Sequence, residues 1–182
     1  MEHIFDYTSP KGLNFNFIQP NDEQEINKIF KLQNDIYNNL ENKKILCKSS
    51  YNEIVDAFLH KEIYCIYCNN ELAGFFMVVK NRKAKRNYVS LIPNLTINYF
   101  DVVTFDIIII APKFRGHNLQ QQALAFTTKL AKGFKQAKYI CATVSPENYF
   151  SLNNFLNQNF KIYQRVCESY HNLDRYIVIK YL

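Results

Sequence analysis

Glycine and proline are scarce in this sequence, and long hydrophobic runs are absent. The 182 residues include only four glycines and five prolines, with no Gly- or Pro-rich tract where an interdomain linker would lie. The apolar runs at 72–79 and 107–111 are far shorter than the roughly 20 residues of a membrane-spanning helix. The first residues carry acids and no basic segment followed by a hydrophobic one, which argues against a signal peptide. We therefore expect one domain over residues 1–182, no membrane partner and a cytoplasmic location.

The cysteines are odd in number, five in all. Without an export signal, this favours reduced thiols over a disulfide framework. Cys65 and Cys68 have C-x-x-C spacing, but their segment is typical of a strand, where residues three apart point to opposite faces. No second Cys/His pair follows at zinc-ligand spacing. We expect packing thiols and no metal site.

The net charge is +6, from 22 basic and 16 acidic residues. A positive field suits an anionic ligand or a nucleic acid, and it also keeps a small protein soluble. Five of the seven residues from Lys80 to Arg86 are basic. This run has two interpretations, a nucleic-acid-binding patch and a solvated loop, of which we favour the loop.

Hydrophobic periodicity predicts an α/β fold with a mixed sheet. The predicted strands are 13–19, 62–68, 72–80, 101–110, 139–144, 160–170 and 175–182. The predicted helices run from about 21 to 40, 50 to 60, 118 to 134, and from Ser145 to about 157. The end of the strand at 101–110 is apolar on both faces, which is typical of a central strand. A turn is predicted at 69–71, and residues 88–99 fit neither pattern.

The segment from Ile110 to Gln120 joins this central strand to the start of the third helix. Free backbone N–H groups and the positive end of the helix dipole meet at such a junction, which favours a pyrophosphate. Gly116 permits close approach of the backbone to a ligand, and Arg115 adds positive charge. Asn118 is of a residue type that tolerates a positive φ, so the loop can curl.

This segment resembles the acyl-CoA-binding motif of the GNAT superfamily of N-acetyltransferases, Val-x-Pro-x-Tyr-Arg-Gly-x-Gly-x-Gly/Ala. The matching residues, two of them conservative, are Ile110, Pro112, Phe114, Arg115 and Gly116. Asn118 and Gln120 stand where the family has small residues. A second segment is similar to the later family motif, Asn-x-x-Ala/Ser followed by Tyr and Gly-Phe. It is matched by Asn148 and Ser151, with Asn159-Phe160 at the Gly-Phe position.

The resemblance implies a mostly antiparallel central sheet of about seven strands with four helices, and acetyl-CoA as the acyl donor. The strands ending at Ile110 and Val144 are expected to splay apart around the pantetheine arm. The arm would pair with the backbone of Ile108, Ile109 and Ile110, beside Asn148 and Ser151. The pyrophosphate would lie on Arg115, Gly116, His117, Asn118, Leu119 and Gln120.

The implied reaction is acetyl transfer to a primary amine by direct attack in a ternary complex, with backbone N–H groups stabilising the oxyanion. The acceptor is a small-molecule or protein amine that the sequence does not identify. The resemblance places the acceptor pocket at residues 38–51 and 170–175. It leaves a monomer and a homodimer open.

The catalytic residues follow less directly from the sequence. Phe155 occupies the position where family members often have the Tyr that protonates the departing thiolate; we interpret Phe155 as a packing residue, and Tyr149, Tyr163 or water as the donor. Asp106, in the central strand, is the candidate general base, with a structural ion pair as the alternative. Asp101 and Glu168 are weaker candidates.

Two other functions remain open. Phe155, Asn118 and Gln120 depart from the family pattern, which leaves a non-catalytic acyl-CoA-binding or sensor module as an alternative. The run from Lys80 to Arg86 leaves nucleic-acid binding as a third hypothesis, with steep salt dependence as its signature.

Overall fold

The structure is a computed structural model that describes residues 1–92, 96–167 and 172–182. It confirms an α/β fold whose sheet has the strand order β1-β2-β3-β4-β5-β6-β8-β7. The pairs β1–β2, β2–β3, β3–β4, β6–β8 and β7–β8 are antiparallel, whereas β5 and β6 are parallel. The sheet has eight strands, one more than predicted.

The elements follow the predicted order. The strands are β1 (Glu2–Thr8), β2 (Asn14–Gln19), β3 (Ile63–Cys68), β4 (Glu71–Val79), β5 (Val102–Ile110), β6 (Tyr139–Val144), β7 (Lys161–Val166) and β8 (Arg175–Tyr181). The α-helices are α1 (Gln24–Asn38), α2 (Tyr51–Leu59), α3 (Leu119–Lys132) and α4 (Tyr149–Asn157). Short 3-10 helices include η2 (Tyr88–Leu91), η3 (Tyr99–Asp101) and η4 (Pro112–Phe114).

The chain divides into two compact units, each built from several segments. The first unit comprises Met1–Lys43, Cys47–Met77 and Ile107–Leu119. The second comprises Lys44–Leu46, Val78–Asp106 and Gln120–Leu182. Strand β5 begins in the second unit and ends in the first. That residues 1–182 act as one domain remains a prediction.

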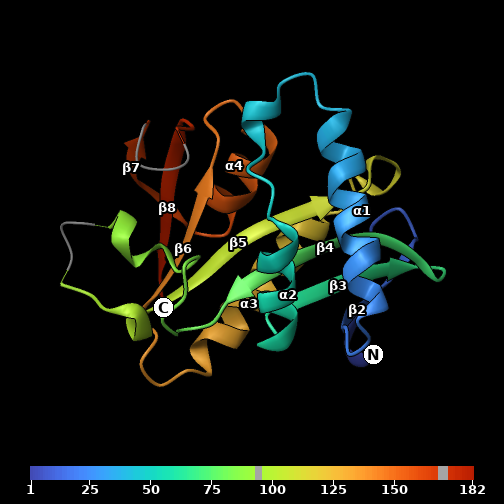
Figure 1. The fold of residues 1–182 in the computed structure, drawn as a ribbon, viewed down its shortest axis with the longest axis horizontal. Helices are drawn as coiled ribbons and strands as arrows, with labels where there is room; N and C mark the ends of the chain where they lie inside the picture. The colour runs from blue at the N-terminus through green and yellow to red at the C-terminus, as the bar shows by residue number, and fades with distance from the viewer. Residues whose placement is uncertain (93–95, 168–171) are drawn as a thin grey trace. The chain divides into compact units, whose positions relative to one another are not determined.

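In the first unit, α1 and α2 lie on the same face of β2, β3 and β4 (Figure 1). Aromatic and β-branched residues fill its core, among them the fully buried Phe15, Phe75 and Ile54. Helix α2 begins with a capping box, in which Ser50 and Glu53 each accept a hydrogen bond from the backbone N–H of the other. Such a cap is worth about 1 kcal/mol, and it explains why the helix starts where the sequence predicts.

The β3–β4 hairpin turns through Asn69 and Asn70, whose φ angles are 49° and 63°. Consecutive positive φ angles are typical of the tight hairpin turn that suits twisted strands, so the predicted turn is confirmed. Cys65 and Cys68 are both buried in β3. Burial raises the pKa of the Cys65 thiol. The thiol therefore stays protonated and packs as a small apolar group.

The sequence prediction misses β1 and misplaces the start of α4. β1 pairs only with β2, and its residues are exposed or half-buried, so it lacks the apolar alternation that marks a strand. Helix α4 begins at Tyr149 rather than Ser145, because the Asn148 side chain caps it by accepting from the Ser151 N–H. Ser145 instead accepts from the Glu147 N–H in the preceding turn. β7 ends at Val166, and the predicted strand residues from Glu168 to Tyr170 lie outside the described residues.

In the second unit, β6 lies between β5 and β8. The parallel pairing runs from Val102 opposite Tyr139 to Phe105 opposite Ala142, so the connection between β5 and β6 is a crossover. Within the unassigned segment, residues 88–91 form the 3-10 helix η2, and the 3-10 helix η3 (99–101) includes Asp101, where the strand was predicted to begin. Within the described ranges, every helix is too short or too polar to span a bilayer.

Candidate functional site

The loop between β5 and α3 curls through two residues with positive φ, Gly116 at 76° and Asn118 at 59°. This confirms the conformational role predicted for Asn118. A Cβ added at Gly116 would lie 3.3 Å from the Lys11 Nζ, so a cation rather than backbone lies over this glycine. Arg115 is exposed and makes no ion pair with any described residue. The loop therefore presents two cations beside a curled backbone, an arrangement that fits a diphosphate.

The side chain of His117 is buried and holds this loop in place, rather than facing a ligand. Its ring is buried, its Nδ1 lies 2.9 Å from the Ser9 Oγ, and its centroid lies 5.5 Å from that of Phe15. Ser9 in turn accepts a hydrogen bond from the Leu13 N–H and so shapes the β1–β2 turn. Leu119 is buried as well. Of the predicted cofactor-binding residues, His117 and Leu119 can therefore contribute only backbone groups.

The end of β5 presents its backbone groups to two different edges. The Ala111 N–H donates to the Ala73 carbonyl at 2.9 Å, and a Cβ at Gly74 would collide with the Ile109 carbonyl oxygen. Ile109 and Ala111 thus face β4, which explains the glycine at position 74. Because successive residues of a strand direct their N–H and C=O groups to opposite edges, Ile108 and Ile110 present theirs away from β4.

In the second unit, a hydrogen-bonded network of side chains joins the starts of α3 and α4. Gln120 Nε2 donates to the Ser151 Oγ at 2.8 Å, and Asn154 Nδ2 donates to the Gln120 Oε1 at 2.9 Å. Gln121 Nε2 completes the network by donating to the Asn154 Oδ1 at 3.2 Å. The structure therefore brings together two predicted cofactor-binding residues, Gln120 and Ser151. Gln121 and Asn154 are additional members that no motif marks.

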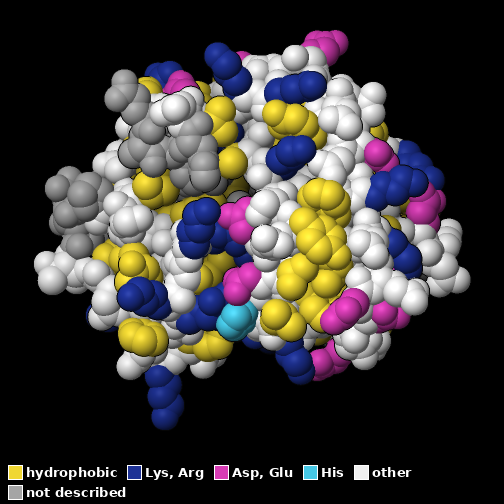
Figure 2. Space-filling model, viewed as in Figure 1, with side chains coloured by type: hydrophobic (Ala, Val, Ile, Leu, Met, Phe, Trp, Pro, Cys, Tyr) yellow, Lys and Arg dark blue, Asp and Glu magenta, His cyan; other side chains and the backbone are white. Residues whose placement is uncertain are grey.

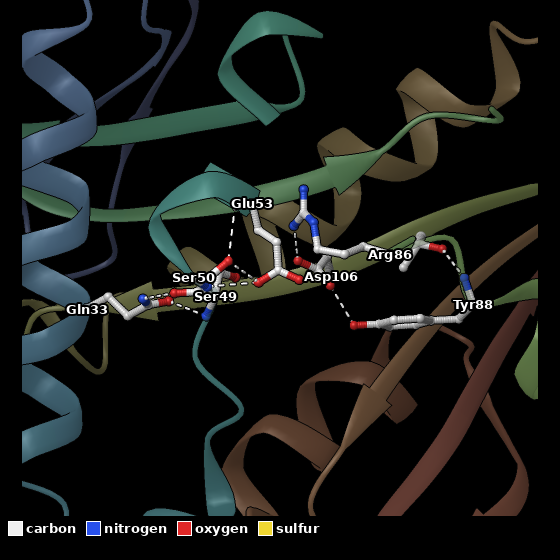
Figure 3. Close-up of polar contacts among 8 residues, drawn as sticks. Gln33, Ser49, Ser50, Glu53, Arg86, Tyr88 and Asp106 are labelled. Carbon is white, nitrogen blue, oxygen red and sulfur yellow. Dashed lines mark hydrogen bonds and ion pairs between the residues drawn. The ribbon is translucent and has the colours of Figure 1, made fainter. Parts of the chain in front are cut away.

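Asp106, the candidate general base, lies in a polar cluster of the second unit (Figure 3). The Arg86 guanidinium forms an ion pair with one carboxylate oxygen, and the Tyr88 hydroxyl donates to the other at 2.5 Å. The Arg86 and Asp106 side chains are only 9% and 6% exposed. This arrangement matches the structural alternative for Asp106. It also corrects one detail of the basic run from Lys80 to Arg86, because Arg86 is buried whereas Lys83 and Lys85 are exposed.

The other candidate catalytic residues occupy contrasting environments. Phe155 is buried, with its ring centroid 5.8 Å from that of Phe105 and 5.1 Å from that of Phe160, as expected of a packing residue. Tyr149 is the first residue of α4 and is 69% exposed, whereas Tyr163 is half-buried in β7. Asp101 pairs with Lys138 and caps η3, and Glu168 lies outside the described residues.

The predicted acceptor segment at 38–51 begins at the end of α1, and all of it except Lys44–Leu46 belongs to the first unit. Gln33 ties this segment to α1, since its amide donates to the Ser49 carbonyl and accepts from the Ser49 N–H (Figure 3). The Lys43 and Lys48 ammonium groups lie 5.5 and 4.8 Å from the centre of the Tyr37 ring. Figure 2 shows a strip of hydrophobic side chains where Figure 1 places α1 and α2. The second predicted wall, 170–175, falls partly outside the described residues.

The fold is that of the GNAT acetyltransferases. Among solved structures, a GNAT-family acetyltransferase of Listeria monocytogenes is 17% identical with a TM-score of 0.73, over 98% of this chain and 100% of that one. NAA60 of Arabidopsis thaliana, solved with acetyl-CoA, is 12% identical with a TM-score of 0.69, over 92% and 99% of the two chains. Naa50 of the same plant, solved with the bisubstrate analogue CoA-Ac-MVNAL, is 15% identical with a TM-score of 0.65, over 91% and 97%.

Comparison of the sequence with protein-family models and with curated proteins finds no match. At these low identities, the structural likeness establishes the fold and does not establish the reaction.

Proposed function

We propose that this protein is an N-acetyltransferase that moves the acetyl group of acetyl-CoA to a primary amine of a small molecule or a protein. The observation that carries the proposal is the loop before α3, where Gly116 and Asn118 take positive φ angles beside the cations of Lys11 and Arg115. The GNAT fold supports it, because that fold places such a loop after a central strand. We propose that residues 1–182 act as a single domain.

The residues of the loop fit the diphosphate of CoA. Gly116 leaves its backbone open to close approach, and Arg115 adds a charge that pairs with none of the described residues. His117 and Leu119, which are buried, fix the backbone from inside. The backbone groups of Ile108 and Ile110, which face away from β4, are the ones suited to pair with the pantetheine arm. Ile109, whose carbonyl faces Gly74, would contribute only by shaping the strand. Asn148 and Ser151 complete the proposed set from α4.

Acetyl-CoA supplies a thioester, whose carbonyl carbon the acceptor nitrogen attacks while the C–S bond breaks. The protein's part is mainly to position the two reactants. The nitrogen must lose a proton, and Asp106 remains the proposed base, although its place between Arg86 and Tyr88 favours the structural role. The proposed proton donors to the thiolate are Tyr149, exposed at the start of α4, or Tyr163 or water.

A non-catalytic acyl-CoA-binding module is the second candidate. It is favoured by Phe155, which lies in an aromatic cluster and offers no proton to a leaving group. This candidate predicts acetyl-CoA binding without turnover on any amine.

Calorimetric titration with acetyl-CoA tests both candidates. We expect the natural protein to bind and Gly116→Glu to lose binding, because the substitution puts bulk and negative charge into the loop. Gly133→Glu is the control for the added charge, since Gly133 lies beyond α3, and we expect it to bind normally. No binding by the natural protein would refute the proposal. Turnover across a panel of small amines and peptides then separates an enzyme from a sensor.

A further inference from the structure

The first turn of α4 leaves two aromatic side chains in solvent. Tyr149 is 69% exposed, and Phe150, at 88%, is the most exposed of the protein's large hydrophobic residues among those described. An isolated exposed hydrophobic residue needs no explanation. The exposure of Phe150 does need an explanation, because of the position of its face of α4.

Phe150 is on the face of α4 that is turned toward the start of α3. Residues four apart lie on the same face of a helix, so Phe150 stands one turn before Asn154. The side chain of Asn154 is hydrogen-bonded to both Gln120 and Gln121 of α3. Tyr149 lies about 100° further around the helix, one turn before the exposed Asn153.

Hydrogen-bond donors accompany the Phe150 ring on this turn. The Ser151 hydroxyl oxygen accepts from Gln120, and its own proton has no acceptor among the described residues. The Asn148 side-chain oxygen caps the helix by accepting from the Ser151 N–H. The side-chain N–H groups of Asn148 have no acceptor among the described residues. A ligand that matches this turn has a flat apolar ring next to oxygen acceptors, as a nucleotide does.

We propose that Phe150 is a stacking surface for the adenine ring of CoA. The inference rests on the proposed function and deepens it, because it assigns the nucleotide end of the same ligand. Tyr149, the neighbour of Phe150, then lies at that end and away from the thiolate, which leaves Tyr163 or water as the proton donor. Gln120 is the last residue of the proposed diphosphate loop and is bonded to Ser151, the neighbour of Phe150. In CoA, the adenosine extends from the diphosphate on the side opposite the pantetheine, so the base lies close to whatever holds the phosphates. Aromatic side chains stack on nucleobases without requiring a specific hydrogen-bond pattern.

A fluorescence experiment tests the contact directly, because the natural chain contains no tryptophan. Phe150→Trp then carries the only indole, and stacking on adenine should quench its emission. We expect acetyl-CoA to quench this variant and acetyl-4′-phosphopantetheine, which lacks the adenosine, to leave it unchanged. Phe100→Trp is the matched control, since Phe100 is a half-exposed phenylalanine of η3. Equal quenching by both ligands, or by neither when both bind, would overturn the inference.

Titration of Phe150→Ala measures the affinity that the ring contributes. We expect acetyl-CoA to bind about tenfold more weakly, as for loss of one base-stacking residue, and acetyl-4′-phosphopantetheine to bind as it does to the natural protein. Leu156→Ala, an exposed position of the same helix, should change neither affinity. An equal loss for both ligands would reveal a purely structural role and refute the stacking. Natural protein that binds neither ligand refutes the proposed function itself, whereas unaltered binding of both by Phe150→Ala refutes only the stacking.

Discussion

Two pairs of arginine and aspartate in the second unit share their chemistry and differ in their surroundings. In the Arg86–Asp106 pair the side chains are 9% and 6% exposed, and the Tyr88 hydroxyl adds a further hydrogen bond. In the Arg165–Asp174 pair, on β7 and just before β8, they are 54% and 40% exposed. The Lys138–Asp101 pair is intermediate, with an exposed ammonium and a buried carboxylate.

Burial, rather than the identity of the charges, decides how much such a pair contributes to the free energy of unfolding. Water competes for the exposed pair, so its formation changes the free energy of unfolding very little. The buried groups have given up water, so the loss of a partner costs each of them more free energy than it costs an exposed group. The residue that the sequence marks as a possible base is therefore also a residue on which the fold depends.

The largest effect is expected for Asp106→Ala, which removes the carboxylate paired with the buried Arg86 guanidinium. We expect the free energy of unfolding to fall by about 3–5 kcal/mol, as for other broken buried pairs. Urea denaturation measures this loss. The double variant Arg86→Met/Asp106→Leu should recover part of it, because two apolar groups need no mutual compensation. A loss below about 1 kcal/mol would place Asp106 with the exposed pairs and reopen its role as an accessible base.

An intermediate effect is expected for Asp101→Asn. The hydrogen bond and ion pair with Lys138, together with the Asn98 N–H, lower the pKa of Asp101. An acid whose pKa falls on folding stabilises the protein above its unfolded pKa, and this contribution is lost as the pH drops through the folded pKa. We therefore expect the substitution to cost about 1 kcal/mol near neutral pH.

That cost should disappear as the pH falls below the ordinary aspartate range. Unfolding in urea at a series of pH values between neutral and strongly acidic checks the sign. A cost that stays constant down to acidic pH would mean that the Asp101 carboxylate gains nothing from its charge.

The smallest effect is expected for Asp174→Asn. The partner Arg165 lowers the pKa of Asp174 by hydrogen bonding, but both groups remain in contact with water. We expect the free energy of unfolding to change very little, and added salt should diminish the change further. Melting temperatures at low and high salt provide the measurement. A loss comparable to that of Asp106→Ala would contradict the ranking by burial.

The elements that bury much of their surface could be predicted from the sequence. The apolar end of β5, the amphipathic α3 and the asparagine turn of the β3–β4 hairpin each carry a local signal. β1 carries none, since an exposed strand paired on one side needs no apolar alternation. The start of α4 was misjudged because Ser145 and Asn148 are both good caps, and only the Ser151 N–H in its final position distinguishes them.

The site was predictable to the extent that its residues are adjacent in sequence. Arg115, Gly116 and Asn118 form one run, so their motif and their backbone conformation could be anticipated. The partners of Asp106 could not, because Arg86 lies within a basic run whose other basic residues are exposed or half-buried, and Tyr88 lies in a segment without periodicity. The environment of His117 depends on Ser9 and Phe15, which are distant along the chain.

The hydrogen bond between His117 and Ser9 joins residues 108 positions apart. A contact of such long sequence separation forms only after much of the chain has been brought together, at an entropic cost that local contacts do not carry. We therefore expect the anchored loop to form late in folding, even though its motif occupies a few consecutive residues. A shortened protein whose translation began after Ser9 would keep every residue of that motif but lose the His117–Ser9 hydrogen bond that holds the loop.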